Sequence, residues 1–351
     1  MRYPMKPLTL LSTLIVLVLA GCREEDIPLK ANASETFYVQ NAGASMRVLV
    51  EGNTKSNTFL LIVHGGPGLG SFSYNTNYIS RHLEDKYAVV YWDQRNAGAS
   101  QGNANQGHLT LPQMTEDLRK VIQVVKSRYG QGSRIFLLGH SFGGLLATSF
   151  LVQEENQHLV NGWIYANGSH NYPLNDSLTR LKLLTVGREQ MASGKHAAKW
   201  REIVNYCQAH AGHLSPADSK RLAAYATEAE TYFDEVKQTG MSGNLSRQAI
   251  RDRVPVTSVV LNLLLTGNGD LNRQLAATSL SALLPRITIP TLVLAGAYDF
   301  ICPQGLGEEV YAQVGATAKR KVISPVSGHA IMQQDEELFC REVNDFLAQY
   351  R

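Results

Sequence analysis

Short, mostly apolar runs of strand length alternate with longer stretches of helical period over most of this chain. The strand-length runs lie at 58–63, 87–92, 134–138, 160–166, 289–295 and 319–323, and a weaker alternating run covers 46–51. Stretches typical of helices cover 78–83, 110–129 and 335–350, and the second of these is amphipathic. Apolar strands separated by helices are typical of a mostly parallel sheet covered on both faces. The pattern therefore predicts an α/β fold.

This alternation stops between residues 170 and 285. The segment is helical in character, with long polar faces and no clear strand, and it lies between two strands of the predicted sheet. A long insertion at such a place is typical of a lid or cap over a functional edge. We therefore expect a core formed by 37–169 and 286–351, and a helical cap formed by 170–285.

The first 21 residues have the pattern of an export signal. Arg2 and Lys6 precede an apolar run over 8–20 that is too short to span a bilayer, and Leu19-Ala20-Gly21-Cys22 follows. This resembles the lipobox of bacterial lipoproteins, which implies cleavage before Cys22 and lipidation of its sulfur. An ordinary signal peptide or an uncleaved anchor is the alternative. We expect 22–36 to tether an exported domain to a membrane, on the periplasmic or cell-surface side.

Charge and cysteine content exclude several other classes of function. The chain has 33 Lys and Arg against 30 Asp and Glu, with no basic patch interleaved with aromatic residues, so nucleic acid is not an expected partner. Apart from Cys22, three cysteines cannot form a disulfide framework, although one bridge is possible: Cys207, Cys302 and Cys340. The spacing of Cys207, His210 and His213 does not suit a metal, because the third residue falls on another helix face. No metal or cofactor is expected.

The clearest candidate for chemistry lies between a strand and a helix. An apolar run from Arg134 leads directly into Gly139-His140-Ser141-Phe142-Gly143-Gly144, and helical spacing follows. A sharp turn here strains the backbone of its central residue and leaves no room for side chains two positions away, which accounts for Gly139 and Gly143. The pattern predicts a nucleophile elbow with Ser141 as nucleophile. A plain glycine-rich turn is the alternative.

Two backbone N–H groups are candidates for an oxyanion hole beside Ser141. Phe142 begins the predicted helix, whose free N–H groups and positive dipole end face the nucleophile. His64-Gly65-Gly66-Pro67-Gly68 follows a buried strand, and such a glycine run lets the backbone approach a ligand closely. We therefore expect Gly66 and Phe142 to supply the two N–H groups, with a simple Gly-Pro loop as the alternative.

Two polar groups are expected to hold this loop in place. His64 precedes the nucleophile in the chain, so we expect it to form hydrogen bonds within the loop rather than to act as the base. Asp93-Gln94-Arg95 follows the strand at 87–92 and is expected to hold the loop through an arginine–carboxylate pair. The alternative for the second group is a solvated loop.

Asp299 and His329 complete the candidate machinery. Asp299 lies just past the strand at 289–295, and His329 lies in the loop after the strand at 319–323. A serine hydroxyl is a weak nucleophile at neutral pH, so His329 would take its proton and return it to the leaving group. Asp299 would fix the imidazole tautomer and stabilise its charged form. The order Ser141, Asp299, His329 is the one expected in an α/β-hydrolase.

Together these motifs resemble the α/β-hydrolases of the proline iminopeptidase family. The resemblance covers about residues 45–168 and 287–351 and rests on four motifs: His64-Gly65-Gly66-Pro67-Gly68, Asp93-Gln94-Arg95 with Gly98 and Ser100, Tyr298-Asp299-Phe300-Ile301-Cys302-Pro303, and Gly328-His329. It implies an α/β-hydrolase fold with an inserted cap and a serine hydrolase activity.

The chain departs from that family in two places. The family's elbow usually reads Gly-Gly-Ser-Trp-Gly, whereas His140 and Phe142 flank the serine here. Its aminopeptidases carry cap glutamates, typically beside a tryptophan, that bind the α-amine of the substrate. Trp200-Arg201-Glu202 matches this pattern only in part, so the resemblance offers Glu202 as the substrate-binding candidate.

The resulting hypothesis is a hydrolase that cleaves small substrates through an acyl-enzyme intermediate. The resemblance favours an aminopeptidase that releases an N-terminal residue, often proline, from short peptides. An esterase, lipase-like or lactone-cleaving enzyme with the same triad is the alternative. Acyl transfer to an alcohol and an inactive binding lipoprotein are two further readings. An acidic side chain between cap and Ser141 would favour peptides, whereas an entirely apolar lining would favour esters.

Overall fold

In the computed structural model, residues 28–102, 106–212, 214–237 and 270–351 are described. The strands are β1 (Ala33–Asn41), β2 (Ala44–Gly52), β3 (Thr58–Val63), β4 (Ala88–Trp92), β5 (Gln101–Gly102), β6 (Arg134–Ser141), β7 (Gly162–Gly168), β8 (Thr291–Gly296) and β9 (Lys319–Ser324). The α-helices are α2 (Asn77–Ile79), α3 (Leu111–Tyr129), α4 (Phe142–Leu151), α5 (Tyr172–Ser193), α6 (Ala197–Ala209), α7 (Pro216–Lys237), α10 (Asp270–Ala276), α11 (Gln304–Gln313), α12 (Ile331–Gln334) and α13 (Glu336–Tyr350). Short helical turns lie between them: η1 (Thr54–Ser56), η2 (Phe72–Tyr74), η3 (Ser80–Glu84), η4 (Gln106–His108), η5 (Glu154–Leu159) and η6 (Ser281–Arg286).

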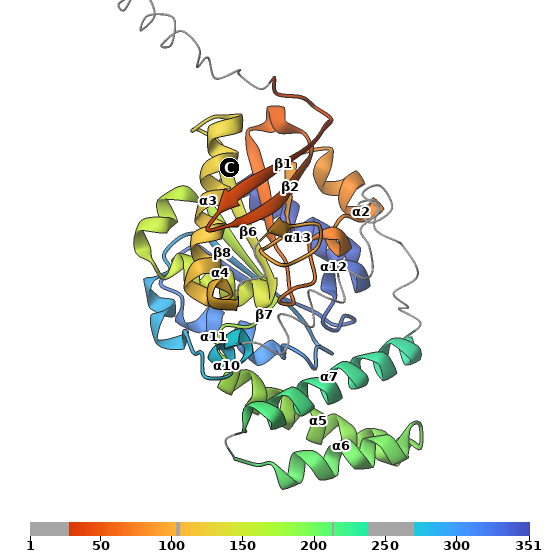
Figure 1. The fold of residues 1–351 in the computed structure, drawn as a ribbon. Helices are drawn as coiled ribbons and strands as arrows, with labels where there is room; N and C mark the ends of the chain where they lie inside the picture. The colour runs from red at the N-terminus through yellow and green to blue at the C-terminus, as the bar shows by residue number, and fades with distance from the viewer. Residues whose placement is uncertain (1–27, 103–105, 213, 238–269) are drawn as a thin grey trace, which may run out of the picture.

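One nine-stranded sheet forms the centre of the molecule (Figure 1). Its strands lie in the order β1-β2-β4-β3-β6-β7-β8-β9, and β5 pairs with β2 off this path. β1, β2 and β4 pair antiparallel, whereas every pair from β4 through β3 to β9 is parallel. Most of the apolar runs coincide with the parallel strands. The predicted fold class, a mostly parallel sheet flanked by helices, is confirmed.

Helices cover both faces of the sheet because its strands present apolar side chains on both sides. On one face the core is shared with α3, α4 and α11, which contribute Leu118, Leu145 and Val310 among others. On the other face it is shared with α2, η3 and α13, which contribute Ile79, Leu83 and Phe339. Alternate residues of one strand enter opposite cores, as period-2 geometry requires: Leu61 faces the first and Leu60 the second. The sheet is therefore a rigid support for the loops at its ends.

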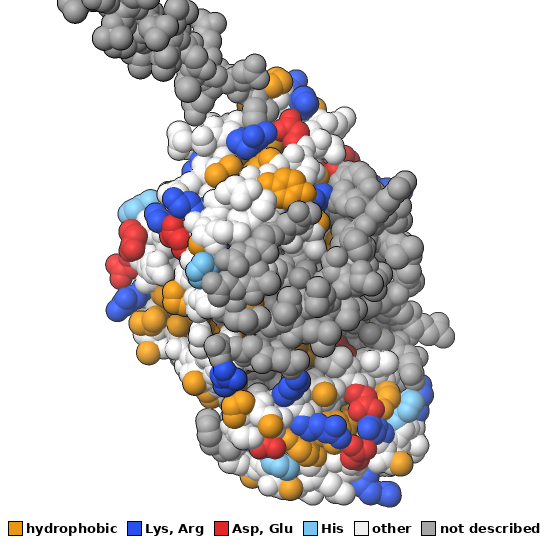
Figure 2. Space-filling model, viewed as in Figure 1, with side chains coloured by type: hydrophobic (Ala, Val, Ile, Leu, Met, Phe, Trp, Pro, Cys, Tyr) orange, Lys and Arg blue, Asp and Glu red, His pale blue; other side chains and the backbone are white. Residues whose placement is uncertain are grey.

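Three helices inserted between β7 and β8 form a separate apolar cluster. These are α5, α6 and α7, here called the cap helices, and Figure 1 shows them grouped at one side of the molecule. Their buried residues include Leu183, Trp200, Ile203, Cys207, Leu222 and Ala226. Phe300, from the loop after β8, packs into the same cluster. Figure 2 shows charges of both signs interspersed over this part of the surface. The cap interior is thus in contact with the loop that carries Asp299.

The sheet begins earlier than the sequence predicts. β1 starts at Ala33 and pairs with β2 along its whole length, from Ala33 opposite Gly52 to Asn41 opposite Ala44. The tether predicted over 22–36 is therefore wrong at its end, because residues 33–36 gain the backbone hydrogen bonds of an edge strand. The predicted signal peptide 1–21 and Cys22 lie outside the described residues.

Other expectations are resolved only in part. Over the described ranges, no helix combines the length and apolar character needed to cross a bilayer. Cys207, Cys302 and Cys340 are buried and free, so none of these three is bridged to another. His213 and residues 238–269 of the predicted cap lie outside the described part of the chain.

Candidate active site

Ser141 lies at the corner between β6 and α4. The strand ends at Ser141 and the helix begins at Phe142. The backbone torsions of Ser141, φ 56° and ψ −126°, lie in a region that a residue with a side chain rarely occupies. The carbonyl of Ser141 accepts a hydrogen bond of 3.0 Å from the N–H of Ser169, which follows β7. The predicted strained corner is confirmed, and a neighbouring segment holds it.

Close backbone contacts account for the glycines around this corner. A Cβ on Gly143 would overlap the carbonyl oxygen of Val63, and one on Gly139 would lie 2.6 Å from the carbonyl oxygen of Gly143. A Cβ on Gly65 would lie 2.9 Å from the Cβ of Ser141. Both distances are shorter than van der Waals contact allows. The loop after β3 therefore packs directly against the corner.

Asp299 is fully buried and is held by three segments of the chain. Its Oδ1 accepts the backbone N–H of Ile301 at 2.8 Å and of Cys302 at 2.7 Å. Its Oδ2 accepts the side-chain N–H of Asn167 and lies 3.0 Å from Nδ1 of His329. Burial by itself raises the pKa of Asp299, but the charge and hydrogen bond of His329 and the bond from Asn167 lower it below its ordinary value. The carboxylate therefore stays ionised beside the imidazole.

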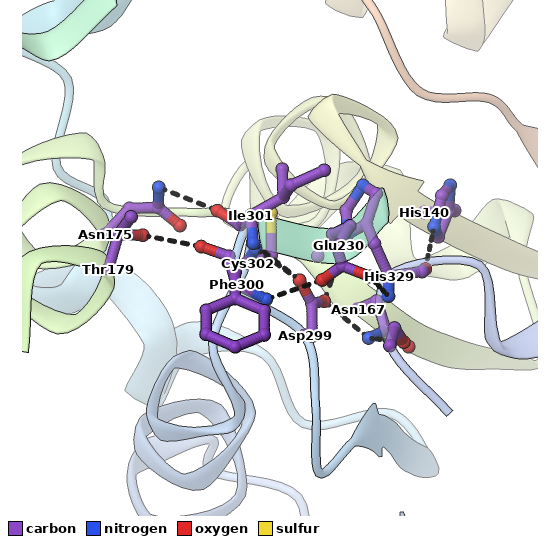
Figure 3. A network of polar contacts seen from close by, with 12 residues as sticks. His140, Asn167, Asn175, Thr179, Glu230, Asp299, Phe300, Ile301, Cys302 and His329 are labelled. Atoms are coloured by element: carbon purple, nitrogen blue, oxygen red, sulfur yellow. Dashed lines mark hydrogen bonds and ion pairs between the residues drawn. The ribbon is translucent and has the colours of Figure 1, made fainter. Parts of the chain in front are cut away.

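Both the ring and the backbone of His329 have defined partners. Nδ1 donates to Asp299, so in the neutral ring Nε2 is the nitrogen that can accept a proton. The backbone N–H donates to Glu230 at 3.1 Å, and the backbone carbonyl lies 2.9 Å from Nε2 of His140 (Figure 3). Burial lowers the pKa of His329, but the charges of Asp299 and Glu230 raise it to a net value above the ordinary one. This imidazole is oriented as a general base requires.

A cap residue, Glu230, reaches the same cluster from α7 (Figure 3). Its Oε1 accepts the backbone N–H of Phe300 at 2.6 Å, and its Oε2 accepts that of His329. Burial, followed by the charge of Asp299, raises the pKa of Glu230 to about 7. A Cβ on Gly328 would overlap Oε2, so the glycine leaves room for the carboxylate. One cap side chain therefore spans the loops of Asp299 and His329.

Cys302 connects the corner at Ser141 to the aspartate loop. The side chain of Ser141 lies close enough to its thiol to lower the pKa of the thiol, and its backbone N–H donates to Asp299. Burial raises the pKa of the Cys302 thiol, and the charge of Asp299 raises it further, so the thiol is a neutral neighbour. Ser141, Asp299 and His329, far apart in sequence, thus belong to one polar cluster where β6, β8 and β9 end.

The loop that carries Gly66 is held by His64 and Gln94. Nδ1 of His64 donates to the carbonyl of Gly65 at 2.7 Å, and Nε2 accepts the backbone N–H of Gln94 at 3.1 Å. The side-chain amide of Gln94 donates to the carbonyl of His64 at 2.8 Å. Gly66 has a φ of 126°, which favours glycine. As the sequence predicts, His64 bonds within the loop.

The expected arginine–carboxylate pair forms, but in a different place. Arg95 Nη2 lies 2.7 Å from Asp117 of α3, and both side chains are buried. Asp93 instead accepts both the backbone N–H and the hydroxyl of Ser71, at 2.6 and 2.7 Å. The Arg95 pair therefore ties the loop after β4 to α3, while Asp93 anchors the segment that leads into η2.

Glu202 lies away from this cluster. Its side chain is 45% exposed on α6, and its carboxylate accepts from Lys199 at 3.0 Å and from Tyr225 at 2.8 Å, with Arg221 also paired to it. Trp200 is buried in the cap. Glu202 lies two residues further along the same helix, so its side chain points to nearly the opposite side of that helix. The structure therefore does not bring Glu202, the substrate-binding residue expected from the resemblance, to the candidate site.

Sequence analysis missed two residues of the cluster. Asn167 is the last residue but one of β7, beside the strand of Ser141, and its amide donates to Asp299 and to the carbonyl of Gly328. The position of Asn167 near the end of a predicted strand is a signal from which it could have been identified. Glu230 lies within a 22-residue helix and no motif surrounds it. Only the folded chain identifies Glu230.

Comparisons with known proteins agree with this fold. Residues 58–335 match the family model described as alpha/beta hydrolase fold. Among curated proteins, the probable aminopeptidase YbaC of Bacillus subtilis is 23% identical over 341 residues, which cover 91% of this chain and 98% of that protein. A proline iminopeptidase of Saccharolobus solfataricus is 24% identical over 310 residues, covering 84% and 86%.

A solved structure shares the fold. The crystal structure of a proline iminopeptidase of Mycobacterium smegmatis matches with a TM-score of 0.62 and covers 91% of this chain and 98% of that one. The sequence identity is 18%. At this identity, the likeness concerns the fold.

Proposed function

Since the chain belongs to the α/β-hydrolase family, we propose that Ser141, Asp299 and His329 are its catalytic triad. The observation that carries the proposal is the convergence of these residues, from the ends of three parallel strands, on one buried polar cluster. The buried carboxylate orients the imidazole, and the strained corner presents the hydroxyl. This arrangement suits acyl transfer to serine.

The reaction proceeds in two halves. The Ser141 oxygen attacks the carbonyl carbon of the substrate while His329 Nε2 takes the hydroxyl proton. The N–H groups of Gly66 and Phe142 stabilise the oxyanion that forms. The intermediate collapses to an acyl-serine as His329 gives its proton to the leaving group. Water, deprotonated by the same imidazole, then attacks the acyl-serine, and His329 returns that proton to the Ser141 oxygen as the acid leaves.

We propose that the substrate is a short peptide with a free N-terminal amine. A cap carboxylate, Glu230, hydrogen-bonds both triad loops and is 8% exposed. A protonated amine is the natural partner of a partly buried carboxylate. Two relatives reported above are named a probable aminopeptidase and a proline iminopeptidase, and both names describe enzymes that act on such substrates. Of the two cap glutamates considered, Glu230 rather than Glu202 has the position for this role.

A pair of substrates tests the proposal. Prolyl-naphthylamide and a short-chain nitrophenyl ester are compared on the purified enzyme and on Glu230→Gln. Loss of an amine–carboxylate contact costs about 1.5–3 kcal/mol, so kcat/KM for the amide should fall by about 10- to 100-fold, mainly through KM. The ester carries no amine, so its kcat/KM should fall less than that of the amide, and only as far as the loss of one backbone acceptor disturbs the two loops.

Glu202→Gln is the matched control on the same cap. It should leave both substrates within about twofold of the unmodified enzyme, because its carboxylate is engaged at the surface. If Glu202→Gln loses amide cleavage and Glu230→Gln does not, the assignment of the amine site is reversed. Ester turnover without any amide cleavage would reject the peptidase and leave the esterase alternative, which uses the same triad.

We also propose that the protein is exported and tethered through a lipid on Cys22. The lipobox-like stretch supports this, and the first strand begins eleven residues after it, at Ala33. Labelling with radioactive palmitate in cells should mark the protein and should be lost in Cys22→Ser. A labelled Cys22→Ser protein would overturn the tether.

A further inference from the structure

A chain of three hydrogen bonds links the oxyanion loop to the loop of His329. The N–H of Gly65 donates to the hydroxyl of Tyr74 at 2.9 Å. That hydroxyl lies 2.6 Å from Nδ1 of His140, and Nε2 of His140 lies 2.9 Å from the carbonyl of His329. Tyr74 and His140 are 5% and 7% exposed, so water does not replace these bonds readily. Three segments that flank Ser141 are therefore connected through two buried side chains.

The chemistry of the groups fixes the direction of every proton in this chain. A carbonyl can only accept, so Nε2 of His140 carries the proton and donates to His329. Burial, followed by the neighbouring His329, lowers the pKa of His140 to about 3, so the ring is neutral and its Nδ1 accepts. The Tyr74 hydroxyl therefore donates to Nδ1 and accepts from Gly65. In each of the three bonds one donor therefore faces one acceptor.

His329 is consequently held on both sides of its backbone. Glu230 of the cap accepts its N–H, and His140 of the core donates to its carbonyl. The rings of His140 and His329 are also in contact, with their centroids 4.7 Å apart. Tyr74 itself sits at the end of η2, whose preceding residue, Ser71, is anchored by Asp93. The middle of the chain of bonds is therefore anchored as well, and its two ends are the backbone N–H of Gly65 and the backbone carbonyl of His329.

We propose that Tyr74 and His140 are positioning residues that set the distance between the Gly65–Gly66 loop and His329, and so align the oxyanion donors with the base. His140 occupies the elbow position before the nucleophile, from which its ring reaches the carbonyl of His329. Neither residue exchanges a proton with the substrate. The inference rests on the proposed triad but not on the choice between peptide and ester.

The experiment measures ester hydrolysis in Tyr74→Phe, His140→Leu and His140→Gln. Phe keeps the buried ring of Tyr74 and removes only the hydroxyl, and we expect kcat to fall 10- to 100-fold with KM within about threefold. His140→Leu should behave similarly. Gln carries an amide donor and acceptor spaced like the two ring nitrogens, so His140→Gln should recover kcat to within about fivefold of the unmodified enzyme. Tyr38→Phe and His158→Gln, at exposed positions, are the matched controls.

Three results would overturn the proposal. The first is a Tyr74→Phe enzyme with unchanged kcat. The second is a His140→Gln enzyme whose kcat is as low as that of His140→Leu, although both variants have the unfolding temperature of the control variants. The third is a His140→Gln enzyme whose acid limb of kcat/KM moves by a full pH unit, since that would make His140 an ionising group. If His140→Leu does not fold, Tyr74→Phe alone decides. Retained activity in Ser141→Ala would instead refute the triad, a separate failure.

Discussion

The core and the cap contribute to the site by different routes. The core contributes four polar groups that lie near the end of a parallel strand or in the loop that follows one: Ser141, Asn167, Asp299 and His329. The cap contributes Glu230 from within the long helix α7. Parallel strands bring their carboxyl ends to one edge, so position along the sheet predicts which side chains meet. Position along a cap helix predicts much less, because it depends on how the helix packs.

The largest effect is expected in the core, at Asp299. Asp299→Asn keeps the shape of the side chain but lets an amide face His329, which favours the wrong imidazole tautomer. We expect kcat to fall by about 10⁴-fold for esters and amides alike. Asp345→Asn, at an exposed position of α13, should leave kcat unchanged. A fall of less than tenfold at Asp299 would contradict its role in orienting the base.

Substitution of one glycine in the core and one in the cap compares the stiffness of the two regions. A Cβ on Gly143 in the core would overlap the Val63 carbonyl, which belongs to the central sheet, whereas one on Gly187 in the cap would lie 2.7 Å from a methyl of Val204. The backbone cannot move as easily as a side chain, so Gly143→Ala should cost about 3 kcal/mol or more and Gly187→Ala about 1 kcal/mol or less. Thermal unfolding measures both.

Gly132→Ala is the control for that pair, since nothing lies within 4 Å of a Cβ there. Its unfolding temperature should match that of the unmodified protein within about 2 °C. Equal destabilisation by Gly143→Ala and Gly187→Ala would show that the cap packs as rigidly as the core, and would contradict the expected difference in stiffness between them.

The smallest effect is a shift in pH dependence caused by the cap. The charge of Glu230 raises the pKa of His329, which must be neutral to act as a base. Glu230→Gln removes that charge and lowers the pKa of His329. The acid limb of kcat/KM for an ester should therefore move to lower pH by about half a unit. Glu228→Gln, on the same helix but paired with Lys199, should leave the acid limb in place. A shift to higher pH in Glu230→Gln would contradict the predicted sign.

The sequence predicted the core because its signals are local. A few neighbouring residues are enough to recognise each of these features: the continuous apolar strands, the glycines around Ser141, and the places of Asp299 and His329 after strands. The start of β1 at Ala33 was missed because an edge strand buries few of its side chains and its pattern is weak. Glu230 was missed because an amphipathic helix carries many glutamates, and only tertiary packing decides which one turns inward. Glu202 was selected by its neighbour Trp200, although that tryptophan packs inside the cap.

The central claim, that Ser141 is a nucleophile activated by His329, has one direct measurement. The purified protein is treated with a fluorophosphonate, and its intact mass is followed over time. We predict one adduct per chain, none in Ser141→Ala, and labelling slowed by at least about 10³-fold in His329→Gln. Rapid labelling of Ser141→Ala, or of His329→Gln at the rate of the unmodified protein, would contradict the claim.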